Sequence, residues 1–302
     1  MRFVRTNIIN PVSPNSAELS IDHLLVIDGS QIVSSMLFED FKGAYEDFRD
    51  CLVVPGFIDL HVHLSQYKIR GLYHPALLPW LEKSVFPEEQ KSRDRHFANV
   101  LSEEFFNAIT KAGTTCSVVY TAPFVEAVEE AFAVAKQREL RTFIGMTLMD
   151  MNSPKELIQT TEYALSNSIK LHQQWHNRQQ NYIFTPRFAP TCSEKLMRGI
   201  AEYARDSNAY IQTHLSENPD EIRWVQKIFN KPSYTDVYND FGLLTTNTIL
   251  AHAIHIDDRE LEIIESSGAS IAHCPDSNFY LKSGEFPIRS EEHTSELQSP
   301  NT

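Results

Sequence analysis

Two histidines close a short apolar run near residue 60 and could chelate a cation. The run 55–66 reads PGFIDLHVHLSQ, and His61 and His63 stand two positions apart within it. Side chains alternate between the two faces of a strand, so this spacing places both imidazoles on one face. Neutral imidazole is a common ligand of zinc and of neighbouring transition metals. The pair therefore predicts part of a metal site, although H-x-H also arises by chance on a strand with one polar face.

Further histidines follow later strand-like runs. The run 209–214 ends in His214, and the run 247–252 ends in His252. A single buried histidine is often satisfied within a core. However, the carboxyl ends of parallel strands meet on one face of a barrel, and catalytic residues gather there. Several histidines at strand ends therefore favour one common site over separate core positions.

The elements that would position these residues alternate regularly along the chain. The predicted strands are 57–63, 114–120, 142–148, 181–185, 209–214, 247–252 and 269–273. The predicted helices are 76–85, 94–111, 123–138, 154–176 with Ser153 at its N-cap, 193–206, 219–229 and 257–266. Such alternation predicts an α/β fold with a parallel sheet, and seven units in a row predict a (β/α)8 TIM barrel over 55–288 that lacks its last unit. An open doubly wound sheet is less favoured, because no glycine-rich loop follows the first strand.

The two ends of the chain differ from this repeat. Residues 1–54 alternate apolar and polar side chains around the turn signal Asp28-Gly29, which predicts a hairpin in a small β domain, part of a composite β-sandwich. The segment 289–299, RSEEHTSELQS, has no apolar periodicity and resembles the translation of a sequencing adapter. We therefore expect 289–302 to be a non-native tail. A genuine polar C-terminal tail is the alternative.

Composition narrows the class of partner. The chain has 302 residues, 42% of them hydrophobic, and 27 Lys and Arg against 40 Asp and Glu give a net charge of −13. This charge argues against a nucleic-acid partner and favours a small-molecule substrate. The four cysteines form no C-x-x-C pair, which favours reduced thiols in a cytoplasmic protein. The sequence contains no run of 18 apolar residues, so it predicts no membrane span.

Several longer motifs resemble one enzyme family. The stretch 55–66 resembles the metal-dependent amidohydrolase superfamily, and the likeness runs over about 20–288. The motifs LLPWLEKSVFPEE (77–89), FTPRFAPTCS (184–193), THLSENPDEIRWV (213–225) and ASIAHCPDSNFYLKSG (269–284) are more specific, and they resemble the guanine deaminase family within it. The resemblance implies hydrolytic deamination of guanine to xanthine and ammonia by water that one divalent metal activates. Zinc is the expected metal, with iron and manganese left open.

The resemblance also implies roles for individual residues. The metal ligands that it implies are His61, His63 and His214. The side chains that it places against the purine are Gln66, Arg187, Phe188, His214 and Glu217. Arg187 stands where binuclear members carry a bridging lysine or glutamate, and an arginine only donates, so one metal is expected.

Two further roles concern proton transfer. Glu217, in the segment H-L-S-E, resembles the proton shuttle of the family, and His252 would lie beside the attacking water or the developing oxyanion. The plain alternatives are an acid at the start of a helix and a core histidine. His255 and His273 are expected to be structural.

One departure from the family pattern affects activity. The superfamily has an aspartate at the end of the eighth strand, and no eighth strand is predicted here. Asp276 follows the seventh strand, while Asp257 and Asp258 start a helix. We therefore expect the polypeptide as written to be inactive or nearly so, and a full-length parent to be active. A homodimer is a possible state of that parent. The alternatives are an amidohydrolase for another aminopurine, nucleoside or triazine, and a non-catalytic metal-binding relative.

Overall fold

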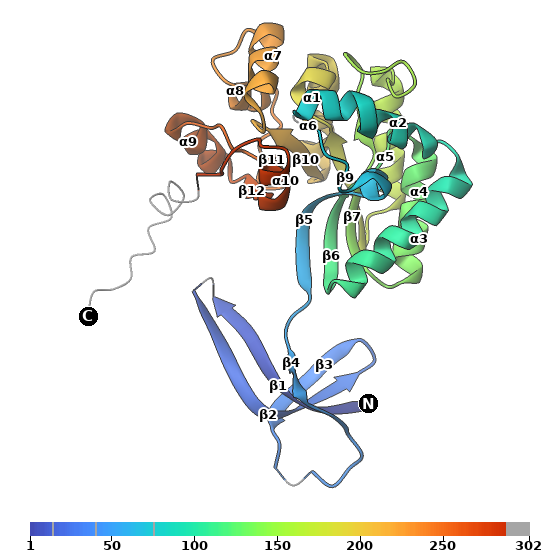
Figure 1. Cartoon of the computed structure of the whole chain (residues 1–302), viewed down its shortest axis with the longest axis vertical. Coiled ribbons are helices and arrows are strands. Elements are labelled where there is room, and N and C mark those ends of the chain that lie inside the picture. The colour runs from blue at the N-terminus through green and yellow to red at the C-terminus, as the bar shows by residue number, and fades with distance from the viewer. Residues whose placement is uncertain (14, 40, 75, 288–302) are drawn as a thin grey trace, which may run out of the picture. The chain divides into compact units, whose positions relative to one another are not determined.

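The protein, seen here as a computed structural model, divides into two units that we describe separately, Met1–Phe57 and the part that begins at Ile58 (Figure 1). The structure describes residues 1–287 with the exception of 14, 40 and 75. The segment 289–302, which we expected to be a non-native tail, lies outside the described residues. Within the described part, no helix has the length and apolar character needed to cross a bilayer.

The first unit is a four-stranded sheet with the order β3-β2-β1-β4. Its strands are β1 (Arg2–Ser13), β2 (Ser16–Asp28), β3 (Gln31–Leu37) and β4 (Glu46–Val53). The predicted hairpin is confirmed, because Asp28 pairs with Gln31 across the turn and Gly29 has the positive φ, +58°, that glycine adopts readily. The parallel pairing of β1 with β4 was not predicted.

The second unit is built on a curved sheet of seven strands in the order β12-β11-β10-β9-β7-β6-β5. The strands are β5 (Phe57–His63), β6 (Thr114–Tyr120), β7 (Arg141–Gly145), β9 (Gln180–Pro186), β10 (Tyr210–Leu215), β11 (Thr248–His252) and β12 (Ser270–Ala272), and the short β8 (Thr147–Leu148) also pairs with β9. The recorded pairings from β6 to β12 are all parallel. This arrangement confirms the predicted α/β fold with a nearly closed seven-stranded TIM barrel.

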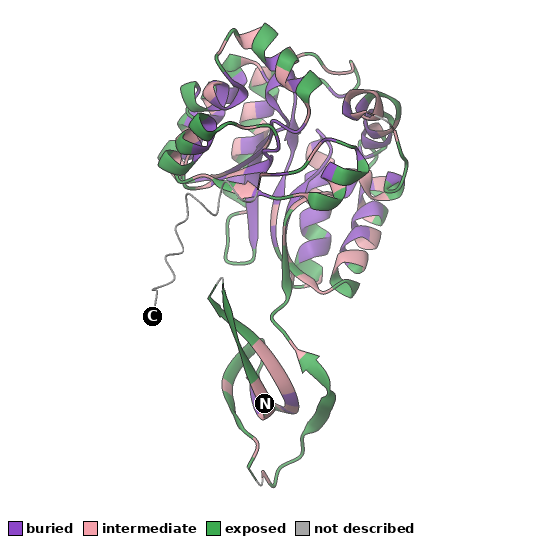
Figure 2. Ribbon diagram, turned by 60° about the vertical axis from the view of Figure 1, so that its left-hand side comes forward, coloured by how far each residue is buried: buried purple, intermediate pink, exposed green. Residues whose placement is uncertain are grey.

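Helices follow the strands and cover the sheet (Figure 1). They are α1 (Leu77–Trp80), α2 (Phe86–Lys91), α3 (Arg95–Lys111), α4 (Val125–Gln137), α5 (Thr161–Gln174), α6 (Glu194–Ser207), α7 (Pro219–Phe229), α8 (Tyr234–Asp240), α9 (Asp258–Ser267) and α10 (Pro275–Tyr280). Helical turns of other types are η1 (Leu64–Ile69) and η3 (Ala189–Thr191), which are 3₁₀, and η2 (Leu81–Val85), which is a π-helix. The apolar core lies between these helices and the central strands, which Figure 2 shows as buried. Helices α8 and α10 were not predicted.

The predicted helix 154–176 is wrong over 154–160. The helix observed is α5, and Thr160 is its N-cap in place of Ser153, with its side chain accepting a hydrogen bond from a backbone N–H in the first turn. Asp150 explains the loop that precedes it, because its carboxylate accepts hydrogen bonds from the backbone N–H and the hydroxyl of Ser193 at 2.7 and 2.6 Å. This contact, 43 positions apart in the chain, holds the segment against the start of α6.

Two other predicted boundaries need correction. The helix predicted over 76–85 continues through a π-helical turn, η2, and through α2 to Lys91. The strand predicted over 142–148 is interrupted at Met146, between β7 and β8. Close packing at this break requires a glycine, because a Cβ on Gly145 would lie 1.8 Å from Oγ1 of Thr185 on β9.

Candidate active site

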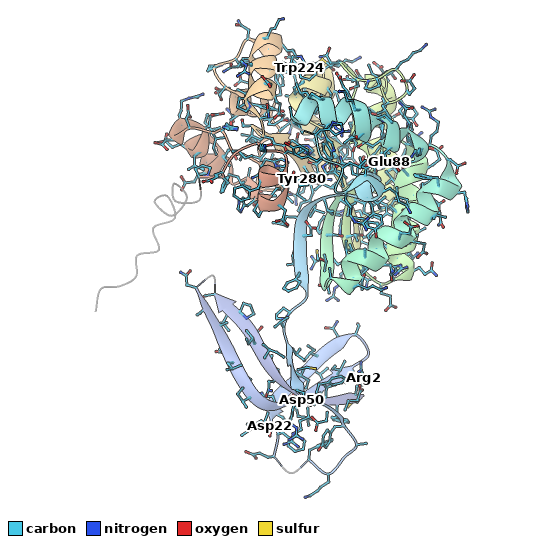
Figure 3. All side chains as sticks on the ribbon, viewed as in Figure 1. Arg2, Asp22, Asp50, Glu88, Trp224 and Tyr280 are labelled. Carbon is cyan, nitrogen blue, oxygen red and sulfur yellow. The ribbon has the colours of Figure 1, made fainter. Side chains whose placement is uncertain are left out.

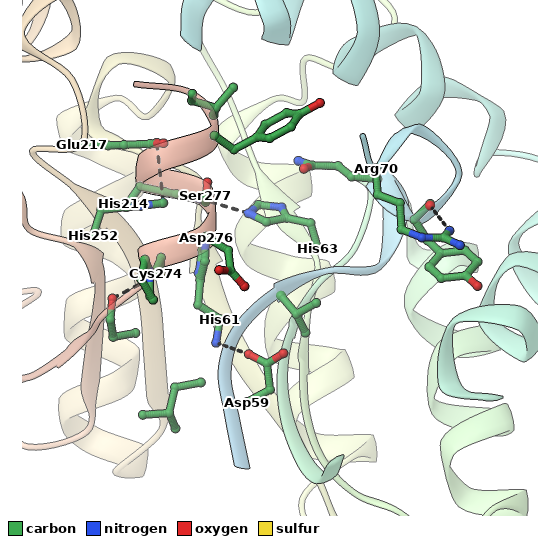
Figure 4. Close-up of a pocket in the computed structure, with 18 of the residues that line it drawn as sticks. Asp59, His61, His63, Arg70, His214, Glu217, His252, Cys274, Asp276 and Ser277 are labelled. Atoms are coloured by element: carbon green, nitrogen blue, oxygen red, sulfur yellow. Dashed lines mark hydrogen bonds and ion pairs between the residues drawn. The ribbon is translucent and has the colours of Figure 1, made fainter. Parts of the chain in front are cut away.

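Four imidazoles converge at the carboxyl-terminal ends of three barrel strands. His61 and His63 end β5, His214 lies near the end of β10, and His252 ends β11. The ring centroid of His61 lies 4.9 Å from that of His63, 4.8 Å from that of His214 and 5.1 Å from that of His252. Figure 4 shows the four labelled histidines grouped in the pocket. All the histidines that were predicted to take part in the chemistry therefore lie together.

His252 reaches this cluster through an irregular backbone. In the parallel pairing of β10 with β11, His214 lies opposite Ala251 and Leu215 lies opposite His252. Paired residues on neighbouring strands point to the same face, so a regular strand would turn His252 away from His214. His252 instead has a φ of +74°, and its ring stacks on that of His214 with centroids 5.5 Å apart. Such backbone strain is concentrated at functional sites.

The imidazoles are held in their neutral form. Burial, and then the positive charge that a neighbouring imidazole would carry, lower the pKa of His61, His63 and His214 well below the ordinary value. His214 Nδ1 donates to the backbone carbonyl oxygen of Arg187 at 2.6 Å, since that oxygen can only accept. His214 Nε2 is then unprotonated, and it lies 3.1 Å from Nε2 of His63. The bond from Nδ1 to a backbone carbonyl oxygen is of the kind that commonly orients a metal-binding histidine.

The nitrogen atoms of this cluster fit a metal ion. Within the described part of the chain, donor atoms of His61, His214 and His252 lie within 4.8 Å of one another. The predicted set had His63 in place of His252, and His63 meets His214 at 3.1 Å. Two nitrogens bound to one tetrahedral zinc lie about 3.3 Å apart, given Zn–N bonds of about 2.0–2.1 Å. The set with His252 therefore brings three nitrogens close enough for one cation, while of the predicted set the His63–His214 pair has the spacing that one zinc requires.

The loop after β10 places an acid beside the imidazoles. Glu217 is 4% exposed, and burial raises the pKa of its carboxyl to about 7. Its Oε2 lies 3.5 Å from Nε2 of His252, and the hydroxyl of Ser283 donates to its Oε1 at 3.5 Å. The other ring nitrogen of His252 donates to Oδ1 of Asn278 at 2.8 Å. A carboxyl that titrates near neutral pH can both accept and release a proton there.

A cavity of about 890 Å³ opens beside this cluster, and the predicted substrate-binding residues all line it. They are Gln66, Arg187, Phe188, His214 and Glu217. Gln66 lies in η1, directly after β5, and Arg187 and Phe188 follow β9. The guanidinium of Arg187 is buried and pairs with Glu89 at 2.7 Å. The cavity therefore combines apolar walls with a few polar groups, as small-molecule sites do.

Some residues of the site were not predicted. Glu89 and Asn278 each hydrogen bond to a cavity residue, and Glu221 lines the cavity and is buried beside Glu217. Burial, and then the charge of Glu217, raise the pKa of Glu221 to about 7. The only signal in the sequence was that these residues fall in or beside the longer family-like motifs.

Three other residues singled out in the sequence, His255, His273 and Asp276, lie near the cavity or at its wall. His255 donates to the backbone carbonyl oxygen of Ser283 at 2.7 Å, in keeping with a structural role. His273 lines the cavity, and its ring lies 5.1 Å from that of Phe286. Asp276 is in the first turn of α10 and also lines the cavity.

The sequence matches a known family over most of its length. The model of the amidohydrolase family matches residues 52–295. The guanine deaminase of Escherichia coli (strain K12) is 36% identical over 247 residues, which cover 80% of this chain and 56% of that protein. The guanine deaminase of Dictyostelium discoideum is 34% identical over 314 residues, which cover 96% of this chain and 70% of that protein. The chain thus spans from about half to about seven tenths of the length of these relatives.

A solved structure supports the same likeness. It is that of guanine deaminase from C. acetobutylicum, which has guanine bound in its active site. It superposes on this chain with a TM-score of 0.92 at 31% sequence identity, and the match covers 97% of this chain and 72% of that one. The arrangement of strands and helices described above is therefore similar to that of an enzyme with a bound purine.

Proposed function

The chain belongs to the amidohydrolase family, and from that premise we propose that its barrel binds guanine and hydrolyses it to xanthine and ammonia. The observation that carries this proposal is the convergence of His61, His63, His214, His252 and Glu217 on one cavity. Similarity to guanine deaminases over 80% or more of this chain supports the choice of substrate.

His61, His63 and His214 would hold the metal, and zinc suits their neutral nitrogens. A divalent cation in such a site supplies Lewis-acid chemistry that makes water a nucleophile near neutral pH. His214 is kept in the required tautomer by its bond to the carbonyl oxygen of Arg187. Because Nδ1 of His214 carries the proton of this hydrogen bond, the ring presents an unprotonated Nε2 to the cluster.

Glu217 would move the protons of the reaction. It takes a proton from the attacking water and delivers protons to the ring nitrogen beside the reacting carbon and to the leaving amine, so that water and guanine give xanthine and ammonia. Its carboxyl is buried beside His252, whose Nε2 lies 3.5 Å away. Because Nδ1 of His252 donates to Asn278, its Nε2 is unprotonated and would accept a hydrogen bond from the attacking water.

The purine would be recognised by polar side chains that line the cavity. Arg187 donates to the carbonyl oxygen of guanine, and Gln66 can both donate to and accept from the edge of the base. Phe188, which is buried and lines the cavity, borders the ring. An arginine donor paired with a carbonyl oxygen would distinguish guanine from aminopurines that lack this oxygen.

Other features of the protein belong to the same proposal. We propose that the enzyme acts on a small purine and not on nucleic acid, because the chain carries a net charge of −13. We also propose a cytoplasmic location, because the four cysteines form no C-x-x-C pair. We further propose that residues 1–54 form part of a composite β-sandwich, and that the full-length parent is a homodimer.

Two measurements test this function. Guanine binding to the zinc-loaded chain is measured by competition, and ammonia release is measured in a form extended with the C-terminal segment of the E. coli relative. We expect guanine binding in the first and ammonia release that Glu217→Gln abolishes in the second. A chain that binds no guanine, together with an extended form that releases no ammonia, would refute the proposal.

A further inference from the structure

The guanidinium of Arg187 contacts two side chains of α2. Glu89 Oε2 accepts a hydrogen bond from Arg187 Nη1 at 2.7 Å, and the Cζ atom of Arg187 lies 5.1 Å from the ring centroid of Phe86. Phe86 and Glu89 are three positions apart, so they lie on the same face of the helix. Both charged side chains are almost completely buried, with 3% and 1% exposure for Arg187 and Glu89.

The carboxylate of Glu89 is also fixed at its second oxygen. The hydroxyl of Ser65 donates to Glu89 Oε1 at 3.3 Å. Ser65 belongs to η1, the turn that follows β5 and that also carries Gln66. The two oxygens of one buried carboxylate therefore connect η1 with the end of β9. This arrangement restricts rotation of the carboxylate and, through it, of the guanidinium.

The position of Glu89 differs from that of the residue it holds. Arg187 lines the cavity, while Glu89 is not among the residues that line it within the described part of the chain. Arginine offers five N–H donors in a planar fork. Among the described residues, the hydrogen bonds of its side chain all use Nη1, to Glu89 and to the sulfur of Met149. Nε and Nη2 are therefore left for a ligand.

We propose that Glu89 is a positioning residue that fixes the guanidinium of Arg187 so that its remaining N–H groups meet the carbonyl oxygen of the purine. This inference rests on the proposed function and adds to it the origin of selectivity for that oxygen. Because a charge-assisted, planar pair holds the donor in advance, little side-chain motion remains to be restricted when the ligand binds. The contribution of Glu89 should appear only with ligands that carry the oxygen.

The experiment compares two purines that differ in this oxygen and in the proton on the ring nitrogen next to it. The zinc-loaded full chain is titrated with 2-aminopurine, which lacks the carbonyl oxygen and is fluorescent, and guanine is then measured by displacement. In Glu89→Gln, we expect the Kd for guanine to rise at least about tenfold and that for 2-aminopurine to change less than about twofold. A general distortion of the site would weaken both ligands together.

Glu88→Gln is the matched control. Glu88, labelled in Figure 3, precedes Glu89 on the same helix and is also buried, but its carboxylate accepts a hydrogen bond from Lys91, at 2.6 Å. We expect both Kd values of this variant to stay within about twofold of those of the unmodified chain. If they change as in Glu89→Gln, the selective role of Glu89 is refuted.

Removal of a buried charge could prevent folding, so Ser65→Ala gives a milder test. It removes only the bond to Glu89 Oε1, and we expect a selective rise of about two- to fivefold in the Kd for guanine. Equal changes for both purines, or none, in the variant that folds would overturn the inference. An unmodified chain that binds 2-aminopurine but not guanine, or neither purine, would instead refute the proposed function on which it rests.

Discussion

Replacement of Glu217 by glutamine should change how the stability of the barrel unit depends on pH. Burial raises the pKa of the Glu217 carboxyl from its ordinary value of 4.5 to about 7. A raised pKa means that the folded state binds the proton more tightly than the unfolded chain does. The stability that this gives is present in full below pH 4.5 and is lost as the pH rises through 7.

The pKa values set the size of the effect. A carboxyl pKa that moves from 4.5 to about 7 corresponds to about 3 kcal/mol of unfolding free energy between pH 4.5 and pH 8. Glutamine has no charge to desolvate, so Glu217→Gln lacks this loss. As the pH rises from 4.5 to 8, the unfolding free energy of the variant should therefore increase by about 3 kcal/mol relative to that of the unmodified protein. Relief of Glu221, whose pKa the charge of Glu217 also raises, acts in the same direction.

Urea unfolding at several pH values measures this difference. The three tryptophans, Trp80, Trp175 and Trp224, all belong to the unit that begins at Ile58, so their fluorescence reports on this unit. A chelator is present throughout, because a bound cation would favour the ionised carboxylate.

An exposed acid provides the control for this measurement. Glu262 lies in the water-facing part of α9, and Glu262→Gln should keep the pH dependence of the unmodified protein. If the free energies of Glu217→Gln and of the unmodified protein differ by the same amount, within about 0.5 kcal/mol, at pH 4.5 and pH 8, the reasoning is wrong.

Three further predictions concern the metal, the buried ion pair and the barrel. His214→Ala should lower zinc affinity at least about tenfold, because it removes a ligand nitrogen. His176, which is exposed, provides the control, and His176→Ala should leave the affinity unchanged. Chelator competition measures both variants, and equal affinities would contradict the assignment of His214 as a ligand. Arg187→Met should lower the free energy of unfolding by about 3–5 kcal/mol, since it leaves the charge of Glu89 buried and unpaired, and an unchanged urea midpoint would contradict this. Gly145→Ala should lower it by at least about 2 kcal/mol, because the new Cβ would lie 1.8 Å from a side-chain oxygen on β9, and a loss below about 0.5 kcal/mol would show that the strand can move away.

Local patterns were sufficient for most of the barrel and for part of the site. His61 and His63 are two positions apart on a strand, so the period of the strand alone places both rings on one side. Helices such as α3 and α6 have an amphipathic face that is visible in their own residues, and Asp94 and Ser193 cap them as such residues do. The prediction failed at the start of α5, where Thr160 and not Ser153 is the cap, and where the backbone N–H of Gln159 donates to the carbonyl oxygen of Met149, at 2.9 Å, outside the helical pattern.

The sequence by itself determined the alternation of strands and helices, the pair of imidazoles on β5 and the polar residues at the strand ends, because each depends on neighbours a few positions apart. Only the tertiary structure decided that His252 turns back to His214 and that Glu89 holds Arg187 across 98 positions of the chain. The positive φ of His252 and the packing of α2 against the end of β9 depend on how the sheet curves and closes. That curvature is set by contacts between distant segments, which no local pattern of residues records.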